Sequence, residues 1–130
     1  MLTVHVDLGD RSYPIAIGAG LFGDKAFATH VDQTLLRRGK IVIITNDVVA
    51  PLYLDKVKAF FAGRDCAEIV LADGEANKTL GAVDSIYEFL LSNKYDRHTT
   101  LVALGGGVVG DITGFAAATY LRGIDFVQIP

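Results

Sequence analysis

The chain has 130 residues, of which 51% are apolar and 21% charged, and its formal net charge is −3. This length and composition predict a single compact domain with a real core and exclude a disordered polypeptide. The scattered basic residues argue against nucleic acid as a partner, and no apolar run approaches the ~18–20 residues of a membrane span.

The N-terminal residues and the cysteine content indicate the cellular compartment. The N-terminus has no basic flank and carries Asp7, so it does not resemble a signal peptide. Cys66 is the only cysteine and cannot form an internal disulfide, which fits a reducing cytoplasm. Because Cys66 opens an apolar segment with no visible activating partner, we interpret it as a buried thiol rather than a nucleophile.

The first forty residues predict a hairpin and a short helix. Residues 2–8 alternate apolar and polar side chains, which is typical of a half-buried strand, and a Gly-Asp turn follows. Residues 12–17 predict a second strand that pairs with the first. Residues 21–30 predict a short helix.

From residue 40 onward, strands and helices alternate. Strands are expected at 40–45, 66–71, 101–104 and 125–129, and helices at 47–61, 79–91 and 112–120. The helix at 79–91 carries an apolar stripe, formed by Leu80, Val83, Ile86, Tyr87, Leu90 and Leu91. Such alternation predicts right-handed βαβ units, and hence a Rossmann-like, mostly parallel α/β sheet flanked by helices, with an N-terminal β-hairpin.

The stretch Leu101 to Asp111, LVALGGGVVGD, is the most informative in the chain. It predicts a strand, a bare glycine turn and then a helix. Each glycine costs about 1 kcal/mol relative to alanine in an ordered element, so four in six residues suggest a positive requirement. One interpretation is a cradle for a pyrophosphate at a helix N-terminus; the other is a tight turn packed against its own sheet. The G-x-G-x-x-G match alone is weak, since the usual fingerprint follows the first strand of the fold.

Three polar or glycine-rich loops should converge where the parallel strands end. They are residues 45–47, 73–78 and 105–111, and ligands bind beyond the carboxyl ends of such sheets. Asn46 can bind a ribose or only cap its helix. Glu75 can accept hydrogen bonds from ribose hydroxyls, or can only be an acid near a helix start that interacts favourably with the helix dipole. Lys78 can sit near a phosphate or be solvated. Asp111, expected in the first helical turn, should meet a hydroxyl because its carboxylate would repel phosphate.

Several kinds of chemistry have no signature. The histidines His5, His30 and His98 lack metal-ligand spacing, and no serine elbow or paired general acid and base is present. A dinucleotide-binding site without a general base or a metal ion can bind a cofactor but lacks the groups that would carry out catalysis. Since the last expected strand reaches Pro130 with no covering element after it, and a parallel sheet needs both faces covered, we expect the chain to be part of a longer enzyme.

Four segments carry a family resemblance: RSYPIAIGAGLF, APLYLDKV, LADGEANK and GGGVVGDITGFAAATYLRGIDFVQIP. Together they resemble the N-terminal, NAD-binding half of 3-dehydroquinate synthase. The resemblance implies a lyase of the shikimate pathway of aromatic amino acid biosynthesis, which converts the sugar phosphate DAHP to 3-dehydroquinate and phosphate. It also implies transient oxidation of the substrate by bound NAD, a divalent metal (zinc or cobalt) in the full-length enzyme, and a homodimer.

The resemblance also assigns residues. The implied NAD contacts are Asn46, Asp73, Gly74, Glu75, Ala76, Asn77, Lys78, Gly106, Gly107, Val108, Val109, Gly110 and Asp111. Arg122 matches a family arginine that binds substrate and reaches across a dimer interface. The resemblance further implies that residues 1–130 are the NAD-binding N-terminal domain and that the metal ligands and most substrate contacts lie in a C-terminal domain beyond Pro130. No catalytic residue or metal ligand is therefore expected in 1–130, and the chain alone should be inactive. Ile44 stands where some relatives carry an acid, which leaves Glu75 as the better candidate for the adenosine ribose.

Two rival interpretations stay open. One is the similar half of an iron-type alcohol or glycerol dehydrogenase, which shares the glycine pattern. Residues 114–130 argue against it because they resemble the synthase. The other is a non-catalytic nucleotide-binding module, which predicts full-affinity binding by this chain alone.

Overall fold

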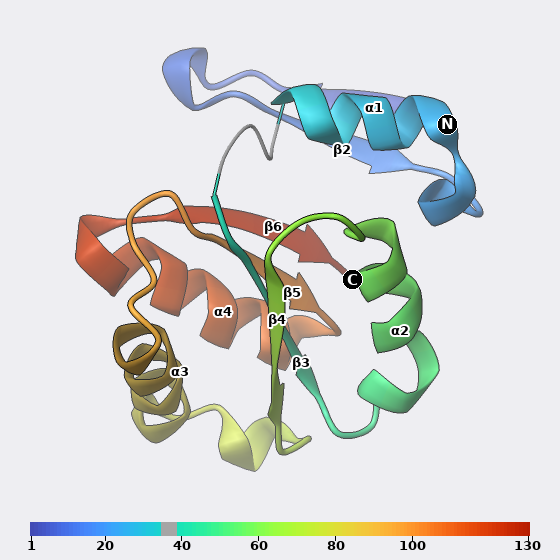
Figure 1. Ribbon diagram of the computed structural model, residues 1–130. Coiled ribbons are helices and arrows are strands. Elements are labelled where there is room, and N and C mark those ends of the chain that lie inside the picture. Colours follow the sequence, from blue (N-terminus) through green and yellow to red (C-terminus); the bar gives the residue numbers. More distant parts are fainter. Residues whose placement is uncertain (35–38) are drawn as a thin grey trace. The chain divides into compact units, whose positions relative to one another are not determined.

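The computed structural model describes residues 1–34 and 39–130 of the chain. The chain divides into two compact units, Met1–Arg37 and Arg38–Pro130 (Figure 1). Among the described residues, every helix is too short or too polar to cross a lipid bilayer.

The first unit is a β-hairpin followed by helices. Strand β1 (Leu2–Val6) pairs antiparallel with β2 (Tyr13–Ile17), which confirms the predicted hairpin. The expectation of a half-buried first strand is wrong, because Leu2 and Val4 are 61% and 42% exposed. A two-stranded ribbon with one short helix offers too little surface to cover one face of the strand.

The helix of the first unit starts later than the sequence pattern suggested. Residues Leu21–Gly23 form a 3₁₀ turn, η2, and the α-helix α1 spans Lys25–Thr34. The reason is Asp24, whose Oδ1 accepts the backbone N–H groups of Ala26 and Phe27 at 2.7 and 3.1 Å. A side-chain acceptor at this position fixes the start of a helix.

The second unit contains a four-stranded parallel sheet, as predicted. Its strands are β3 (Ile41–Asn46), β4 (Cys66–Leu71), β5 (Thr100–Leu104) and β6 (Asp125–Ile129), in the order β4-β3-β5-β6. The chain therefore leaves β3 toward one side for β4 and returns to the other side for β5. The gap between the carboxyl ends of β3 and β5 is the topological switch point, where open α/β sheets bind ligands.

Three α-helices cover this sheet: α2 (Ala50–Phe60), α3 (Leu80–Ser92) and α4 (Gly107–Thr119). Figure 1 shows α3 and α4 together on one face and α2 on the other. The core lies under α3 and α4 and includes Val42, Ile44, Val83, Ile86, Leu90, Leu101, Ala103, Ile112 and Ala116. The predicted apolar stripe of α3 is only partly right, since Leu80 and Leu91 are 76% and 61% exposed.

Helix α4 begins five residues earlier than predicted. The bare turn is confined to Gly105 and Gly106, and the helix starts at Gly107 instead of Ile112. Glycine and valine are weak helix formers, so the sequence pattern gave no helical signal there. The packing of Val109, Ile112 and Ala116 in the core overrides that local preference.

Candidate functional site

Asn46 ends β3 and is tied to its surroundings through both ends of its amide. Its Oδ1 accepts the N–H groups of Val48 and Val49 at 3.1 and 2.8 Å, which holds the turn before α2. The prediction that Asn46 caps the helix itself is wrong, because α2 starts only at Ala50 and has no side-chain cap. The Nδ2 of Asn46 donates to Asp73 Oδ1 at 2.9 Å. The side chain is buried. Because one of the two Nδ2 hydrogens bonds Asp73, one amide hydrogen is left for a ligand, and the rest of the side chain joins the two loops.

A second hydrogen bond joins the same two loops. The backbone N–H of Asp73 donates to Asp47 Oδ1 at 3.1 Å, and the N–H of Asp47 donates to the carbonyl of Leu71 at 3.0 Å. Together with the bond from Asn46, this fixes the loop after β3 against the loop after β4. Asp47 lies in the expected loop 45–47 but is not among the predicted NAD contacts, because nothing in the local sequence separates it from an ordinary helix-leading acid.

The loop after β4 is short and internally ordered. Gly74 has φ +108°, a backbone conformation that favours glycine, and Glu75–Asn77 form a single 3₁₀ turn, η3. Asn77 Nδ2 donates to the carbonyl of Asp73 at 2.7 Å. Glu75 and Ala76 are exposed, and Asp73 is exposed as well, with its Oδ1 bonded to Asn46. The side chain of Asn77 stabilises the shape of the loop.

Lys78 connects this loop to the glycine-rich stretch. Its Nζ lies 2.7 Å from Asp111 Oδ2 and 3.7 Å from Glu75 Oε1. The hydrogen bond and the charge of Asp111 raise the pKa of Lys78, and Glu75 adds to this effect. Asp111 is the fifth residue of α4, so the expectation of an acid in the first helical turn is wrong. Three of the predicted residues are thus brought together.

The four glycines of the stretch have different reasons for lacking a side chain. Gly105 has φ +149°, and a Cβ there would lie 3.1 Å from a methyl group of Val109. A Cβ on Gly110 would lie 2.8 Å from Gln128 Nε2, and the Gly110 amide already donates to the Gly106 carbonyl. Gly110 therefore serves the packing of α4 against β6, a role that the sequence did not reveal.

Gly106 and Gly107 have no such internal reason. A Cβ at either position would meet no atom within 4 Å, and neither has a positive φ. Both are exposed, and Gly106 is the N-cap residue of α4 without a side-chain hydrogen bond to the helix. The first N–H groups of a helix have no partner within it and carry partial positive charge. The next two residues are less exposed: Val108 is half-buried and Val109 is buried. Their packing holds the turn in place.

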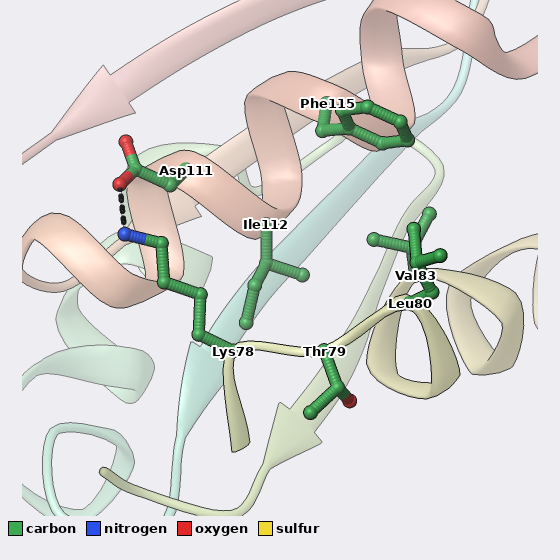
Figure 2. Close-up of a pocket in the computed structure, with 7 residues that line it drawn as sticks. All are labelled: Lys78, Thr79, Leu80, Val83, Asp111, Ile112 and Phe115. Atoms are coloured by element: carbon green, nitrogen blue, oxygen red, sulfur yellow. Dashed lines mark ion pairs between the residues drawn. The ribbon is translucent and has the colours of Figure 1, made fainter. Parts of the chain in front are cut away.

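A cavity of about 290 Å³ lies beside the ion pair, between α3 and α4. Figure 2 shows Lys78 and Asp111 at one end and apolar side chains along the rest. Its lining residues are Lys78, Thr79, Leu80, Val83, Asp111, Ile112 and Phe115. The cavity thus combines an ion pair with an apolar wall.

Arg122 lies far from these loops. It belongs to the 3₁₀ turn η4 (Tyr120–Arg122), between the end of α4 and the start of β6. That is the amino-terminal edge of the parallel sheet, whereas the glycine turn follows the carboxyl end of β5. Arg122 has φ +70° and its neighbour Leu121 φ +48°, both in the left-handed region. The fold therefore does not bring Arg122 to the other predicted residues of the same chain.

Two further expectations concern cysteine and metals. Cys66 is half-buried at the start of β4, and burial raises the pKa of its thiol, which disfavours the reactive thiolate. Within residues 1–34 and 39–130, no group of three or more histidine, cysteine or acidic side chains is arranged to hold a metal ion.

The fold and its carboxyl-edge loops define a parallel α/β domain of the doubly wound class. Residues 68–130 match the family described as 3-dehydroquinate synthase N-terminal. The whole chain is 50% identical to a 3-dehydroquinate synthase of Methylococcus capsulatus and 51% identical to one of Colwellia psychrerythraea. The chain is thus similar over its whole length to the N-terminal part of 3-dehydroquinate synthases, and it spans 35% and 36% of the length of these two relatives.

Solved structures share the fold. A 2-deoxy-scyllo-inosose synthase complexed with carbaglucose-6-phosphate, NAD+ and Co2+ superposes with a TM-score of 0.85 at 23% identity, over 99% of this chain and 34% of that one. A 2-epi-5-epi-valiolone synthase from Streptomyces hygroscopicus, with NAD+ and Zn2+ bound, gives 0.72 at 27% identity, over 96% of this chain and 34% of that one. The predicted fold class is confirmed.

Proposed function

We propose that this chain binds NAD, with the pyrophosphate of the cofactor on the N-terminus of α4. The observation that carries the proposal is the open space at Gly106 and Gly107. Neither the backbone conformation nor the internal packing requires glycine at these two positions. The uncapped N–H groups beside them fit a doubly anionic bridge. Two solved proteins of the same fold have NAD+ bound, which supports the choice of this dinucleotide.

The remaining loops supply the other contacts in this proposal. Glu75, exposed at the tip of η3, is the carboxylate best available for a ribose hydroxyl, since Ile44 is buried and apolar. Asn46 and Asp73 hold the loops that flank the switch point, and Gly74, Ala76 and Asn77 shape the second loop. The cavity of about 290 Å³ beside Lys78 and Asp111, with its apolar wall, would receive the nicotinamide end.

For the whole protein we propose 3-dehydroquinate synthase activity, the conversion of DAHP to 3-dehydroquinate and phosphate. Identity near 50% to proteins of that name, against 23% and 27% to synthases with other names, favours this substrate. NAD, when bound, supplies the acceptor for a transient hydride. The described residues contribute binding and orientation and offer no metal cluster, so no step is assigned to zinc or cobalt within this chain.

Arg122, the subunit arrangement and the compartment complete the proposal. Because Arg122 lies at the edge of the sheet opposite the glycine turn, it would serve the substrate site of a second copy in a homodimer. The single cysteine and the absence of a membrane-spanning helix among the described residues are compatible with a cytoplasmic enzyme.

Calorimetric titration of the chain with NAD tests the cofactor proposal. We expect weak but saturable binding, and we expect Gly106→Val to lower the affinity by about a hundredfold or more by filling the cradle. The matched control is Gly81→Val in the first turn of α3, where a Cβ makes only an ordinary 3.6 Å contact. If Gly106→Val binds NAD as the wild type does, or if the wild type does not bind, the proposal is wrong.

A further inference from the structure

The turn η4, between α4 and β6, has an unfavourable backbone conformation. Leu121 and Arg122 have φ +48° and +70°, and Gly123 follows with φ +116°. The left-handed region is unfavourable for any residue with a side chain, because its Cβ approaches a backbone carbonyl oxygen. The third such residue in the described part of the chain is Lys94, whereas turns such as the one after α2 use a glycine, Gly63. Two adjacent side chains at η4 are therefore held under backbone strain, which the surrounding structure has to offset.

Tyr120, the residue before the strained pair, anchors this turn. Its side chain is 4% exposed, and its Oη donates to the backbone carbonyl of Tyr95 at 2.6 Å. Burial raises the pKa of Tyr120, so the hydroxyl stays protonated and remains a donor. The ring stacks on that of Tyr87 from α3, with the two centroids 6.4 Å apart. The carbonyl of Tyr120 accepts the N–H of Gly123 at 2.9 Å, which closes the turn. The turn is thus tied to α3 and to the segment that leads into β5.

The anchored turn presents a cation to solvent. Arg122 is exposed, and no carboxylate of residues 1–34 and 39–130 lies within ion-pair distance of its guanidinium. An arginine binds a carboxylate or a phosphate most strongly through two parallel hydrogen bonds, which need a defined direction of the side chain. The backbone dihedral angles at Leu121 and Arg122 set that direction.

We propose that Tyr120 is a positioning residue, which holds the left-handed turn and thereby directs the guanidinium of Arg122 toward an anionic group of the substrate in a second copy of the protein. This inference rests on the proposed role of Arg122 in the substrate site. The hydrogen bond from Tyr120 Oη opposes the strain at Leu121 and Arg122. Without this bond the turn can relax toward an ordinary φ, which changes the direction of the arginine and weakens its contact with the substrate.

The experiment is steady-state kinetics of the full-length protein with DAHP and NAD, for the wild type, Tyr120→Phe, Arg122→Ala and the double variant. Tyr120→Phe keeps the buried ring and removes only the hydroxyl. We expect it to raise the KM for DAHP about fivefold, with kcat within about twofold and the KM for NAD unchanged, and we expect Arg122→Ala to raise the KM for DAHP by more than about tenfold. The double variant should have the same KM for DAHP as Arg122→Ala, because Tyr120 acts only through Arg122.

Tyr95→Phe is the matched control. It removes the hydroxyl of a neighbouring buried ring but keeps the backbone carbonyl that accepts the bond from Tyr120. We expect it to have the KM of the wild type for DAHP. An equal rise in Tyr95→Phe and Tyr120→Phe would overturn the inference, since the effect would then be a general loosening of the aromatic cluster.

The other outcomes separate this inference from the one on which it rests. A wild type that does not convert DAHP, or an Arg122→Ala variant with an unchanged KM for DAHP, overturns the proposed role of Arg122 and this inference with it. A raised KM in Arg122→Ala together with an unchanged KM in Tyr120→Phe overturns the inference alone. An effect of Tyr120→Phe that persists in the Arg122→Ala background also overturns it, because Tyr120 would then act independently of the arginine.

Discussion

The N-termini of the α-helices in the described part of the chain fall into two kinds. The first N–H groups of α1 and α3 are accepted by side chains of the protein itself, from Asp24 and Thr79 respectively. Helix α2 has no side-chain cap but carries a proline, which has no N–H, in its first turn. The N-cap residue of α4 is Gly106, which has no side chain to offer and no such bond. Since α3 and α4 lie side by side on one face of the same sheet, their environments are closely matched (Figure 1).

This difference shows which helices are stabilised by a capping side chain and which are not. A serine, threonine, aspartate or asparagine at the N-cap stabilises a helix by about 1 kcal/mol relative to alanine. Helices α1 and α3 have this contribution, and α4 lacks it without the first-turn proline that relieves α2 of one N–H group. A helix end left without a cap, next to glycines that packing does not require, is a feature that ligand binding explains and folding stability does not.

The largest effect is expected from removing the side chain of Asn46. Asn46→Ala takes two acceptor contacts from the turn that leads into α2 and the Nδ2 donor from Asp73, at a buried position. We expect the free energy of unfolding to fall by about 2–3 kcal/mol, measured by urea denaturation. Asn93→Ala is the control: Asn93 makes one exposed hydrogen bond, to the Phe89 carbonyl, and its loss should cost under about 1 kcal/mol. Equal losses in the two variants would mean that the ties around Asn46 do not hold the loops together.

The cap of α3 should matter less, because it is a single exposed bond. Thr79 Oγ1 accepts the N–H of Ala82 at 3.2 Å. Thr79→Ala should lower the free energy of unfolding by about 1 kcal/mol, and Thr79→Ser, which keeps the acceptor, by a few tenths of that. Urea denaturation of both variants measures the difference. Should Thr79→Ala be as stable as the wild type, caps would not distinguish α3 from α4.

Sequence patterns predicted the parallel sheet well, for a physical reason. Strands such as 41–46 and 66–71 are β-branched and apolar, and their ends are marked by polar residues, so periodicity and turn chemistry point the same way. The convergence of the three loops followed from topology alone and is confirmed by the contacts from Asn46 to Asp73 and from Lys78 to Asp111.

What the sequence could not reveal depends on contacts between distant segments. The start of α4 was placed at Ile112 because glycine and valine have low helix propensity, whereas core packing starts it at Gly107. The packing role of Gly110 depends on Gln128, eighteen positions further along the chain and on the neighbouring strand β6. Asp47 joins the site only because the turn after β4 brings the Asp73 amide to it.

The smallest effect on stability, and the sharpest test of the comparison, comes from giving α4 the cap that it lacks. Gly106→Ser places a hydroxyl where it can accept an N–H of the first turn, at a backbone of φ −75° and ψ −162° that serine adopts without strain. We expect the free energy of unfolding to rise by a few tenths of a kcal/mol, since glycine is itself a fair N-cap. The affinity for NAD should nevertheless fall about tenfold, because the new side chain occupies the cradle and competes for the same N–H group. Urea denaturation and calorimetry on the same preparation measure both quantities. A variant that gains stability and keeps its affinity for NAD would show that the cofactor does not bind at the open end of α4. If the free energy of unfolding rises while the affinity falls, this helix end lacks a stabilising cap because it binds a ligand.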